Sequence, residues 1–133
     1  MGKNVSINLA VRERARLFCA TIAVFAGLLA ASPAFSAGAL AIGKCGSYGQ
    51  AFDYASEGAA ITAARNKCKG QCTVVPMKRA CAALAIDMTD PCGAHGYSVA
   101  PKISGAQNKA LLECYKYGGK ECVIRAWACD ARG

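Results

Sequence analysis

The sequence predicts an α+β fold made of two tandem β-β-α-β units with pseudo-two-fold symmetry, stapled by disulfides. Three observations support this prediction. The segment CGSYG at residues 45–49 returns as CGAHG at residues 92–96. Each copy follows a short apolar run and precedes a stripe of small residues at helical spacing, and eight cysteines lie beyond residue 37. Self-similarity of this kind indicates a repeated structural unit.

Residues 1–37 have the pattern of a secretory signal peptide. An apolar run over 17–31 is followed by the small-residue segment SPAFSAGA. The basic residues that precede the run are Lys3, Arg12, Arg14 and Arg16. The run is shorter than the roughly 20 residues that span a bilayer as a helix. We therefore expect cleavage, the loss of Cys19 with the leader, and no transmembrane span in the mature chain; the alternative is an uncleaved anchor.

Residues 38–133 are expected to form a single disulfide-rich α+β domain made of two repeats, about 39–81 and 82–129. The apolar share is mostly Ala and Cys, so the core is thin and needs cross-links. An even number of cysteines in a short exported chain indicates disulfides and an oxidising compartment, the periplasm or the outside of the cell. Without the leader, the net charge falls from +8 to +5, because 12 Lys and Arg then face 7 Asp and Glu.

Each unit is expected to open with two extended segments. The apolar runs at 39–42 and 82–86 fit buried strands, although their length alone also allows a helix. A glycine loop follows, in which glycine permits positive φ or close approach of another backbone. A second extended piece comes next, at 50–54 or 97–100.

One helix is expected in each unit, at about 57–68 and 105–115. The small residues of each helix recur every four positions, which lets the helix lie close to a sheet. They are Ala60, Ala64 and Cys68 in the first helix, and Ala106, Ala110 and Cys114 in the second. Ser56 is the candidate N-cap of the first helix. Ser104 and Gln107 form a capping-box pattern that places the start of the second.

Each unit is expected to close with a third strand. The β-branched runs at 73–75 and 123–124 continue toward a cysteine, and β-branched residues favour strands. Pro76 interrupts the first run, which indicates an edge strand or a bulge at that point.

The symmetry of the repeat reduces the 105 pairings that eight cysteines allow. The helix-end cysteine and the next cysteine are close in sequence in both units, which predicts the local bridges Cys68–Cys72 and Cys114–Cys122. The other four occupy equivalent positions that meet across a two-fold axis, which predicts Cys45–Cys92 and Cys81–Cys129 as bridges between the halves. The alternative is a zinc site drawn from Cys68, Cys72, Cys81, Cys92 and His95. We expect no metal and no cofactor.

No catalytic residue is expected. Cys92 and His95 would serve as nucleophile and base if Cys92 were a thiolate. The even cysteine count favours oxidation of Cys92, and Tyr48 takes the place of His95 in the first glycine loop. The sequence contains no phosphate-binding loop, no GxSxG and no HExxH.

Basic residues follow both helices. The first group is Arg65, Lys67, Lys69, Lys78 and Arg79, and the second is Lys116, Lys120 and Arg125. Two symmetric patches would bind an anionic surface such as lipid headgroups, lipopolysaccharide or a wall polymer; a merely solvated face is the alternative. Nucleic acid is not expected, because the chain is exported and no array of aromatic residues accompanies the patches. The aromatic residues expected in the core and at its rim are Tyr48, Phe52, Tyr54, Tyr97 and Trp127.

An ordered set of segments resembles a known family. ALAIG, YGQAFDY, AAITAARNKC, CTVV and CAALAI follow one another and lead into the second copy. This order resembles the secreted bacterial family called domain of unknown function 4189, over about residues 39–129. The resemblance implies export and a compact disulfide-linked α+β fold, and it carries no catalytic residues over. Leaner members lack cysteines in both glycine loops, so the resemblance supports the bridge between Cys45 and Cys92 least.

The sequence as a whole predicts an exported, non-enzymatic binding module with a basic surface. Its expected partner is an anionic envelope polymer, a lipid headgroup or another protein. The alternative is an inhibitor or immunity-type protein that blocks an envelope or host hydrolase with a disulfide-braced loop such as 92–101.

Overall fold

The computed structural model describes residues 36–130, so nearly all of the predicted signal peptide lies outside the described part of the chain. The described elements follow the order β-β-α-β twice. They are β1 (Ala37–Ile42), the short 3-10 helix η2 (Lys44–Gly46), β2 (Tyr48–Tyr54), α2 (Glu57–Lys67), β3 (Thr73–Met77), β4 (Cys81–Asp87), β5 (His95–Ala100), α3 (Ile103–Lys116) and β6 (Cys122–Cys129). This order confirms the predicted α+β class.

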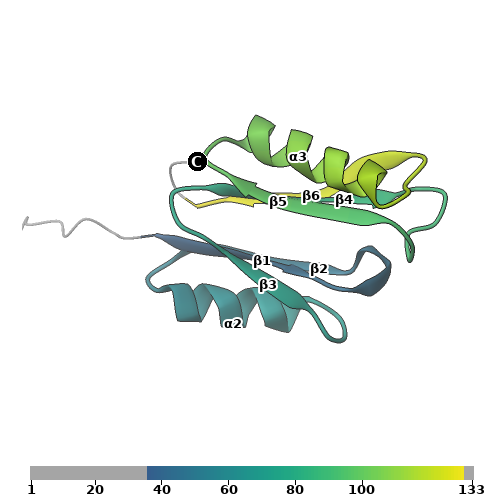
Figure 1. Ribbon diagram of the computed structural model, residues 1–133. Helices are drawn as coiled ribbons and strands as arrows, with labels where there is room; N and C mark the ends of the chain where they lie inside the picture. Colours follow the sequence, from purple (N-terminus) through teal and green to yellow (C-terminus); the bar gives the residue numbers. More distant parts are fainter. Residues whose placement is uncertain (1–35, 131–133) are drawn as a thin grey trace, which may run out of the picture. The chain divides into compact units, whose positions relative to one another are not determined.

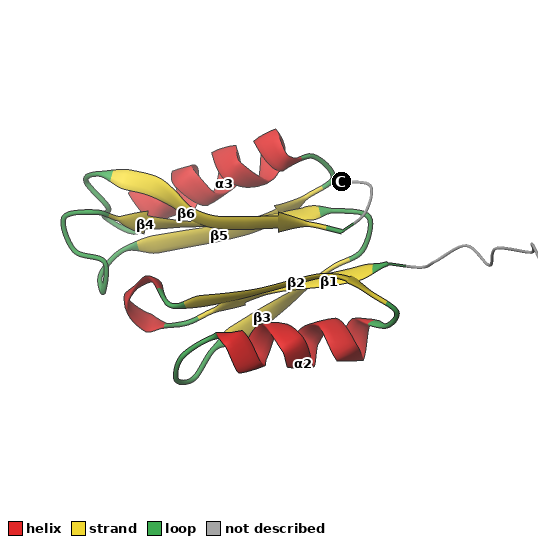
Figure 2. Cartoon of the chain, turned by 180° about the vertical axis from the view of Figure 1, so that it is seen from behind, coloured by secondary structure: helices red, strands yellow, loops and turns green. Residues whose placement is uncertain are grey.

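The six strands form two three-stranded antiparallel sheets with corresponding strand orders, β2-β1-β3 and β5-β4-β6. The two sheets face each other, with α2 on the outer face of the first and α3 on the outer face of the second (Figure 1). The view from behind shows the same four layers, with each helix outside its own sheet (Figure 2). The opening strand of each β-β-α-β unit is therefore central in its sheet.

Alternation of large and small apolar residues along the central strands builds the core. In β1, Leu40 and Ile42 face the second sheet, whereas Ala39 and Ala41 face α2. Strand β4 repeats the arrangement: Leu84 lies in the cluster between the sheets, and its alanine neighbours lie under α3. Successive side chains of a strand point to opposite faces. The Leu and Ile side chains of the repeated ALAI segments therefore fill the layer between the sheets, and the Ala side chains form a thinner layer beneath each helix.

The repeated loop glycines lie where a helix crosses a strand. A Cβ on Gly49 in β2 would overlap the backbone of Ala64 in α2, and a Cβ on Gly96 in β5 would overlap the backbone of Ala110 in α3. The stripes of small residues on the helices make the same close approach possible from the other side. Of the two roles predicted for the loop glycines, close approach of another backbone explains this shared position.

The two helices begin differently. Ser56 caps α2 as predicted, because its Oγ accepts the Ala59 N–H at 3.2 Å. The capping box predicted for α3 is wrong: α3 begins at Ile103, and its N-cap Lys102 makes no side-chain capping bond. Ile103 is partly buried against the core beneath α3. Burial of this side chain favours a helix that begins at Ile103, so Ser104 lies inside the first turn and not at the N-cap.

Four disulfides join Cys45 to Cys92, Cys68 to Cys72, Cys81 to Cys129, and Cys114 to Cys122. These are the four predicted pairs, but one of them has a different place in the fold. Cys81 and Cys129 are register partners on the neighbouring strands β4 and β6, so their bond lies within one sheet and does not bridge the halves. The reason is that Cys81 opens the second sheet instead of closing the first. Among residues 36–130, Cys45–Cys92 is the one disulfide that joins the two sheets.

Candidate functional site

Four loops meet at one end of the domain. They are residues 43–47, 68–72, 88–94 and 117–121, and we refer to them together as the loop end. The Cys45–Cys92 disulfide ties the first loop to the third. The Ser47 Oγ accepts the Lys69 N–H at 2.9 Å, which holds the second loop against the first. The Met88 N–H donates to the Glu121 carbonyl oxygen at 2.9 Å, which holds the third loop against the fourth, so each of the four loops is fixed to a neighbour.

Asp87 at the end of β4 is the anchor of the third and fourth loops. Its carboxylate accepts the backbone N–H groups of Lys120 at 3.0 Å, Glu121 at 3.1 Å and Thr89 at 3.0 Å, and also the Thr89 hydroxyl at 2.9 Å. These bonds favour the charged form. The backbone N–H of Lys120, followed by that of Thr89, lowers the pKa of Asp87 from 3.8 to about 2. Asp87 is therefore a permanently charged structural group at neutral pH.

The loop end gathers most of the predicted basic residues. Arg65 and Lys67 lie in the last turn of α2, and Lys116 lies in the last turn of α3. Lys69 and Lys120 belong to the loops themselves. Arg125 in β6 places its guanidinium 5.6 Å from the centre of the Tyr48 ring. Sequence reasoning missed Lys44, which is exposed in η2 directly before Cys45, although its charge was visible in the sequence.

Few of these cations are neutralised by a neighbour. Within residues 36–130 the one ion pair joins Lys116 Nζ to Glu113 Oε1 at 3.6 Å. Lys67 Nζ donates to the carbonyl oxygen of Gln50 at 2.8 Å. The other basic side chains of the loop end are exposed, and a rigid array of exposed cations concentrates anions near the surface.

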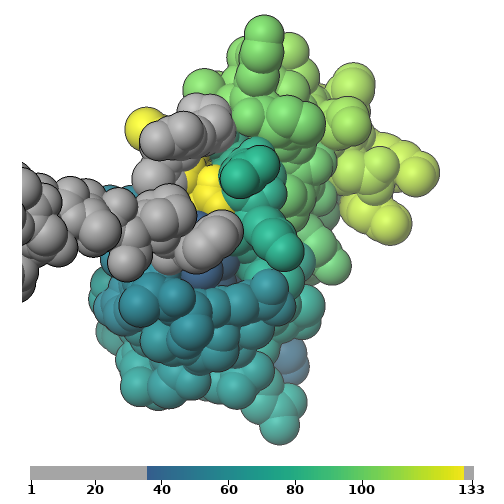
Figure 3. All heavy atoms as spheres, turned by 90° about the vertical axis from the view of Figure 1, so that its left-hand side faces the viewer, coloured from purple at the N-terminus to yellow at the C-terminus, as the bar shows by residue number. Residues whose placement is uncertain are grey.

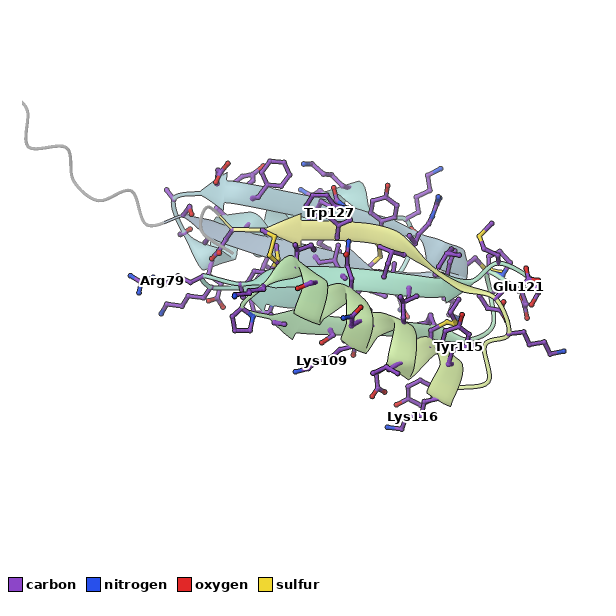
Figure 4. All side chains as sticks on the ribbon, turned by 90° about the horizontal axis from the view of Figure 1, so that it is seen from above. Arg79, Lys109, Tyr115, Lys116, Glu121 and Trp127 are labelled. Atoms are coloured by element: carbon purple, nitrogen blue, oxygen red, sulfur yellow. A yellow bond between two sulfur atoms is a disulfide. The ribbon has the colours of Figure 1, made fainter. Side chains whose placement is uncertain are left out.

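Lys78 and Arg79 do not belong to this array, so the first of the two predicted patches is wrong at these two positions. Met77, directly before them, pairs with Gly38 near the start of β1, whereas Thr73 pairs with Ile42 at its end. Strand β3 thus carries the chain to the opposite end, because Thr73 and Met77 are four steps apart, about 13 Å at roughly 3.3 Å per residue. Figure 4 shows Arg79 at one end of the domain and Lys116 at the other.

The end that carries Arg79 has a structural anchor of its own. The buried carboxylate of Asp130 accepts the N–H of Arg79 and, at 2.8 Å, the N–H of Ala80. Figure 3 faces this end and shows the turn after β3 lying against the end of β6, drawn in yellow. Both carboxylates that the described chain buries, Asp87 and Asp130, therefore hold turns and are not paired with each other.

His95 lies at the start of β5, beside a shallow pocket of about 810 Å³. The pocket is lined by residues 93–97 together with Glu113 and Tyr117. The His95 Nδ1 lies 3.3 Å from the Gly93 carbonyl oxygen. Cys92 is bonded to Cys45, so it provides no thiolate for His95 to activate. The loop predicted at 92–101 is also corrected, because its second part, His95–Ala100, is strand β5.

The alternative zinc site is excluded by the same bonds. Cys68 and Cys72 are joined to each other, and Cys81 and Cys92 are joined to other cysteines. Zinc binds the thiolate form of cysteine, which a disulfide does not offer. No group of three or more possible metal ligands occurs in the described part of the chain.

The aromatic residues are spread over the surface and do not form one shelf. Tyr48 and Tyr54 are half-buried, close to the prediction of core and rim. Phe52, Tyr97 and Trp127 are exposed by 52%, 42% and 52%, more than a core position allows. Tyr97 and Trp127 lie on the two opposite edge strands of the second sheet. The sequence did not indicate this exposure, because alternation along an edge strand does not show how far the facing sheet extends.

The fold and its loops define a class of protein: a small, disulfide-rich α+β domain of the kind that folds in an oxidising, extracytoplasmic environment. Residues 37–129 match the family described as domain of unknown function (DUF4189), and the chain belongs to this family. No curated protein and no solved structure gives a significant match. Within residues 36–130, no helix has the length and apolarity needed to cross a membrane.

Proposed function

We propose that this protein is an exported binding module, periplasmic or secreted, that uses the loop end to attach to an anionic component of the cell envelope. The observation that carries the proposal is the set of exposed basic side chains on and beside the cross-braced loops of the loop end. A disulfide-braced surface loses little conformational freedom on binding, which favours affinity. The ligand chemistry that fits is a repeated array of phosphate or carboxylate groups, as in anionic lipid headgroups or a wall polymer.

We propose that the domain acts by binding and not by catalysis. Every cysteine in the described chain is oxidised, and the buried carboxylates Asp87 and Asp130 hold backbone turns. His95 contacts the Gly93 carbonyl oxygen and has no acidic hydrogen-bond partner among residues 36–130. Asp87 and the Cys45–Cys92 bond brace the loop end, and Asp130 holds the turn at the opposite end.

We further propose that the two β-β-α-β units arose by duplication and are related by a pseudo-two-fold axis. The corresponding strand orders, the equivalent glycines Gly49 and Gly96 under their helices, and the helix-to-strand disulfides Cys68–Cys72 and Cys114–Cys122 support this proposal. Such symmetry brings the C-terminal ends of both helices, with their basic residues, to the same end of the domain.

The test is sedimentation of the oxidised protein with vesicles of phosphatidylglycerol and phosphatidylcholine at increasing salt. We expect binding near 0.01 M salt, where the Debye length is about 30 Å, and its loss near 1 M, where it is about 3 Å. Vesicles of phosphatidylcholine alone are the control. Binding that ignores salt, or that is equal on neutral vesicles, would contradict the proposal.

A further inference from the structure

The four edge strands of the two sheets are not equally protected against pairing with another chain. Proteins block exposed edges with proline, bulges or charged residues. Strand β3 carries Pro76 at the edge, as the sequence predicts. The pairing of β2 with β1 shifts between Ala37 and Ala39, and that of β6 with β4 shifts between Leu84 and Ala85. Each of these three edges therefore has a feature that blocks pairing.

Strand β5 has none of these features. It pairs with β4 without a break, from Cys81 opposite Ala100 to Ile86 opposite His95. Its sequence, HGYSVA, contains no proline and no Lys, Arg, Asp or Glu. Tyr97 and Val99 are exposed by 42% and 39%. Strand β5 is thus a regular, uncharged and partly apolar edge.

The outward backbone groups of β5 belong to alternate residues. The Asp87 N–H donates to the Ala94 carbonyl oxygen at 3.0 Å, so Ala94 faces β4. In an antiparallel ladder the facing alternates from residue to residue. The N–H and C=O groups of His95, Tyr97 and Val99 therefore point away from the sheet. Beyond a 3.5 Å contact between the Ser98 hydroxyl and the Val99 carbonyl oxygen, they make no hydrogen bond within residues 36–130.

We propose that β5 pairs with β5 of a second copy of this chain, antiparallel and centred on Tyr97. The β5-β4-β6 sheet of one copy then joins the β5-β4-β6 sheet of the other to form one six-stranded sheet. Tyr97 lies opposite its own equivalent, and His95 lies opposite Val99 of the second copy. His95, Tyr97 and Val99 of one copy thus lie opposite outward-facing residues of the other, so the ladder of hydrogen bonds is complete in this register. The dimer has two-fold symmetry, so each contact away from the axis occurs twice.

Charge complementarity identifies the occupant as a second copy. In this register Gly93 lies opposite Pro101 of the second copy, so Lys102 of that copy arrives at the pocket of about 810 Å³ beside β5. Glu113 lines this pocket, because α3 crosses directly over Gly96 and brings Glu113 to the edge. Its Oε1 pairs with Lys116 of the same helix at 3.6 Å, and the carboxylate has a second oxygen for Lys102. Each copy thus supplies a Lys102 and a Glu113, so the dimer contains two Lys102–Glu113 charge pairs. The uncharged strand β5 lies between these two pairs. Opposite charges placed in this way fix the register of an interface.

The first test compares two matched substitutions by sedimentation velocity of the oxidised protein. Val99 on β5 and Val123 on β6 are exposed by 39% and 40%, on opposite edges of the same sheet. We expect the unmodified protein to dimerise, Val99→Lys to raise the dimer Kd at least about 10-fold because a charged side chain on the edge strand blocks pairing, and Val123→Lys to leave it unchanged. A protein that stays monomeric up to about 1 mM, including one that instead captures a foreign extended peptide, would overturn the proposal. Equal effects of the two substitutions would also overturn it.

The second test exchanges the charges. Glu113→Lys and Lys102→Glu should each weaken the dimer, and the double variant should restore it. Both positions are at the surface, where such changes leave the fold intact. Failure of the double variant to restore dimerisation, with thermal unfolding unchanged, would refute this register. The dimer does not depend on anion binding at the loop end, so the two proposals can fail separately.

Discussion

Removing the disulfide between Cys45 and Cys92 is expected to cost more stability than removing a local bridge. This bond closes 47 positions of chain, for which the chain-entropy relation gives about 4 kcal/mol. The Cys68–Cys72 bond closes 4 positions, for which the same relation gives about 2 kcal/mol. Cys45 and Cys92 are both exposed, so replacing them with alanine removes little buried surface and isolates the effect of the cross-link.

The assay is urea unfolding of the oxidised double variants, followed by far-ultraviolet circular dichroism. Cys45→Ala with Cys92→Ala is the test variant, and Cys68→Ala with Cys72→Ala is the comparison. Cys68 is buried, so its replacement also removes some packing. We expect the test variant to lose more free energy of unfolding than the comparison, by up to about 2 kcal/mol. An equal or smaller loss would refute the reasoning that this bond, the one between the sheets among residues 36–130, restricts the unfolded chain more than the local bridge does.

Three further predictions follow from single side chains. Gly96→Ala should destabilise the fold by about 1–3 kcal/mol through overlap with the backbone of Ala110, whereas Gly58→Ala, with no neighbour within 4 Å, should be neutral or stabilising in thermal unfolding. Ser56→Ala should cost about 1 kcal/mol in the same measurement, because the Ala59 N–H loses its cap. The lowered pKa of Asp87 predicts stability that is present above pH 3.8 and lost as the pH falls toward about 2. In acid unfolding, Asp87→Asn should reduce the dependence of the free energy of unfolding on pH in this range. An unchanged dependence would contradict the anchoring role.

The sequence predicted the fold closely, because its signals are local. The stripe of Ala60 and Ala64 recurs at the helical period, which predicts the helix from spacing, and the short apolar runs fit strands although their length alone also allowed a helix. The start of α3 was not predicted correctly, because the partial burial of Ile103 outweighs the capping pattern of Ser104. Burial depends on the packed fold and is not visible in a local pattern.

The candidate site was only partly predictable for the same reason. Residues that are neighbours in sequence, such as Lys69 and Lys78, were assigned to one patch, but β3 carries them to opposite ends. The anchoring role of Asp87 depends on N–H groups more than 30 positions further along the chain. No sequence motif predicts a contact over this separation. The exposed edge of β5 depends on the strand order of the folded sheet and on its regular pairing with β4, which no local pattern encodes.

The most direct test of the central claim compares two pairs of charge-removing substitutions in binding to anionic vesicles at low salt. Lys69→Gln with Lys120→Gln neutralises the loop end, and Lys78→Gln with Arg79→Gln removes the same charge from the opposite end. Each basic residue near an anionic surface contributes about 1 kcal/mol, so the loop-end variant should bind about 30-fold more weakly. We expect the opposite-end variant to bind as the unmodified protein does. Equal losses in the two variants would show that net charge, and not the loop end, determines binding.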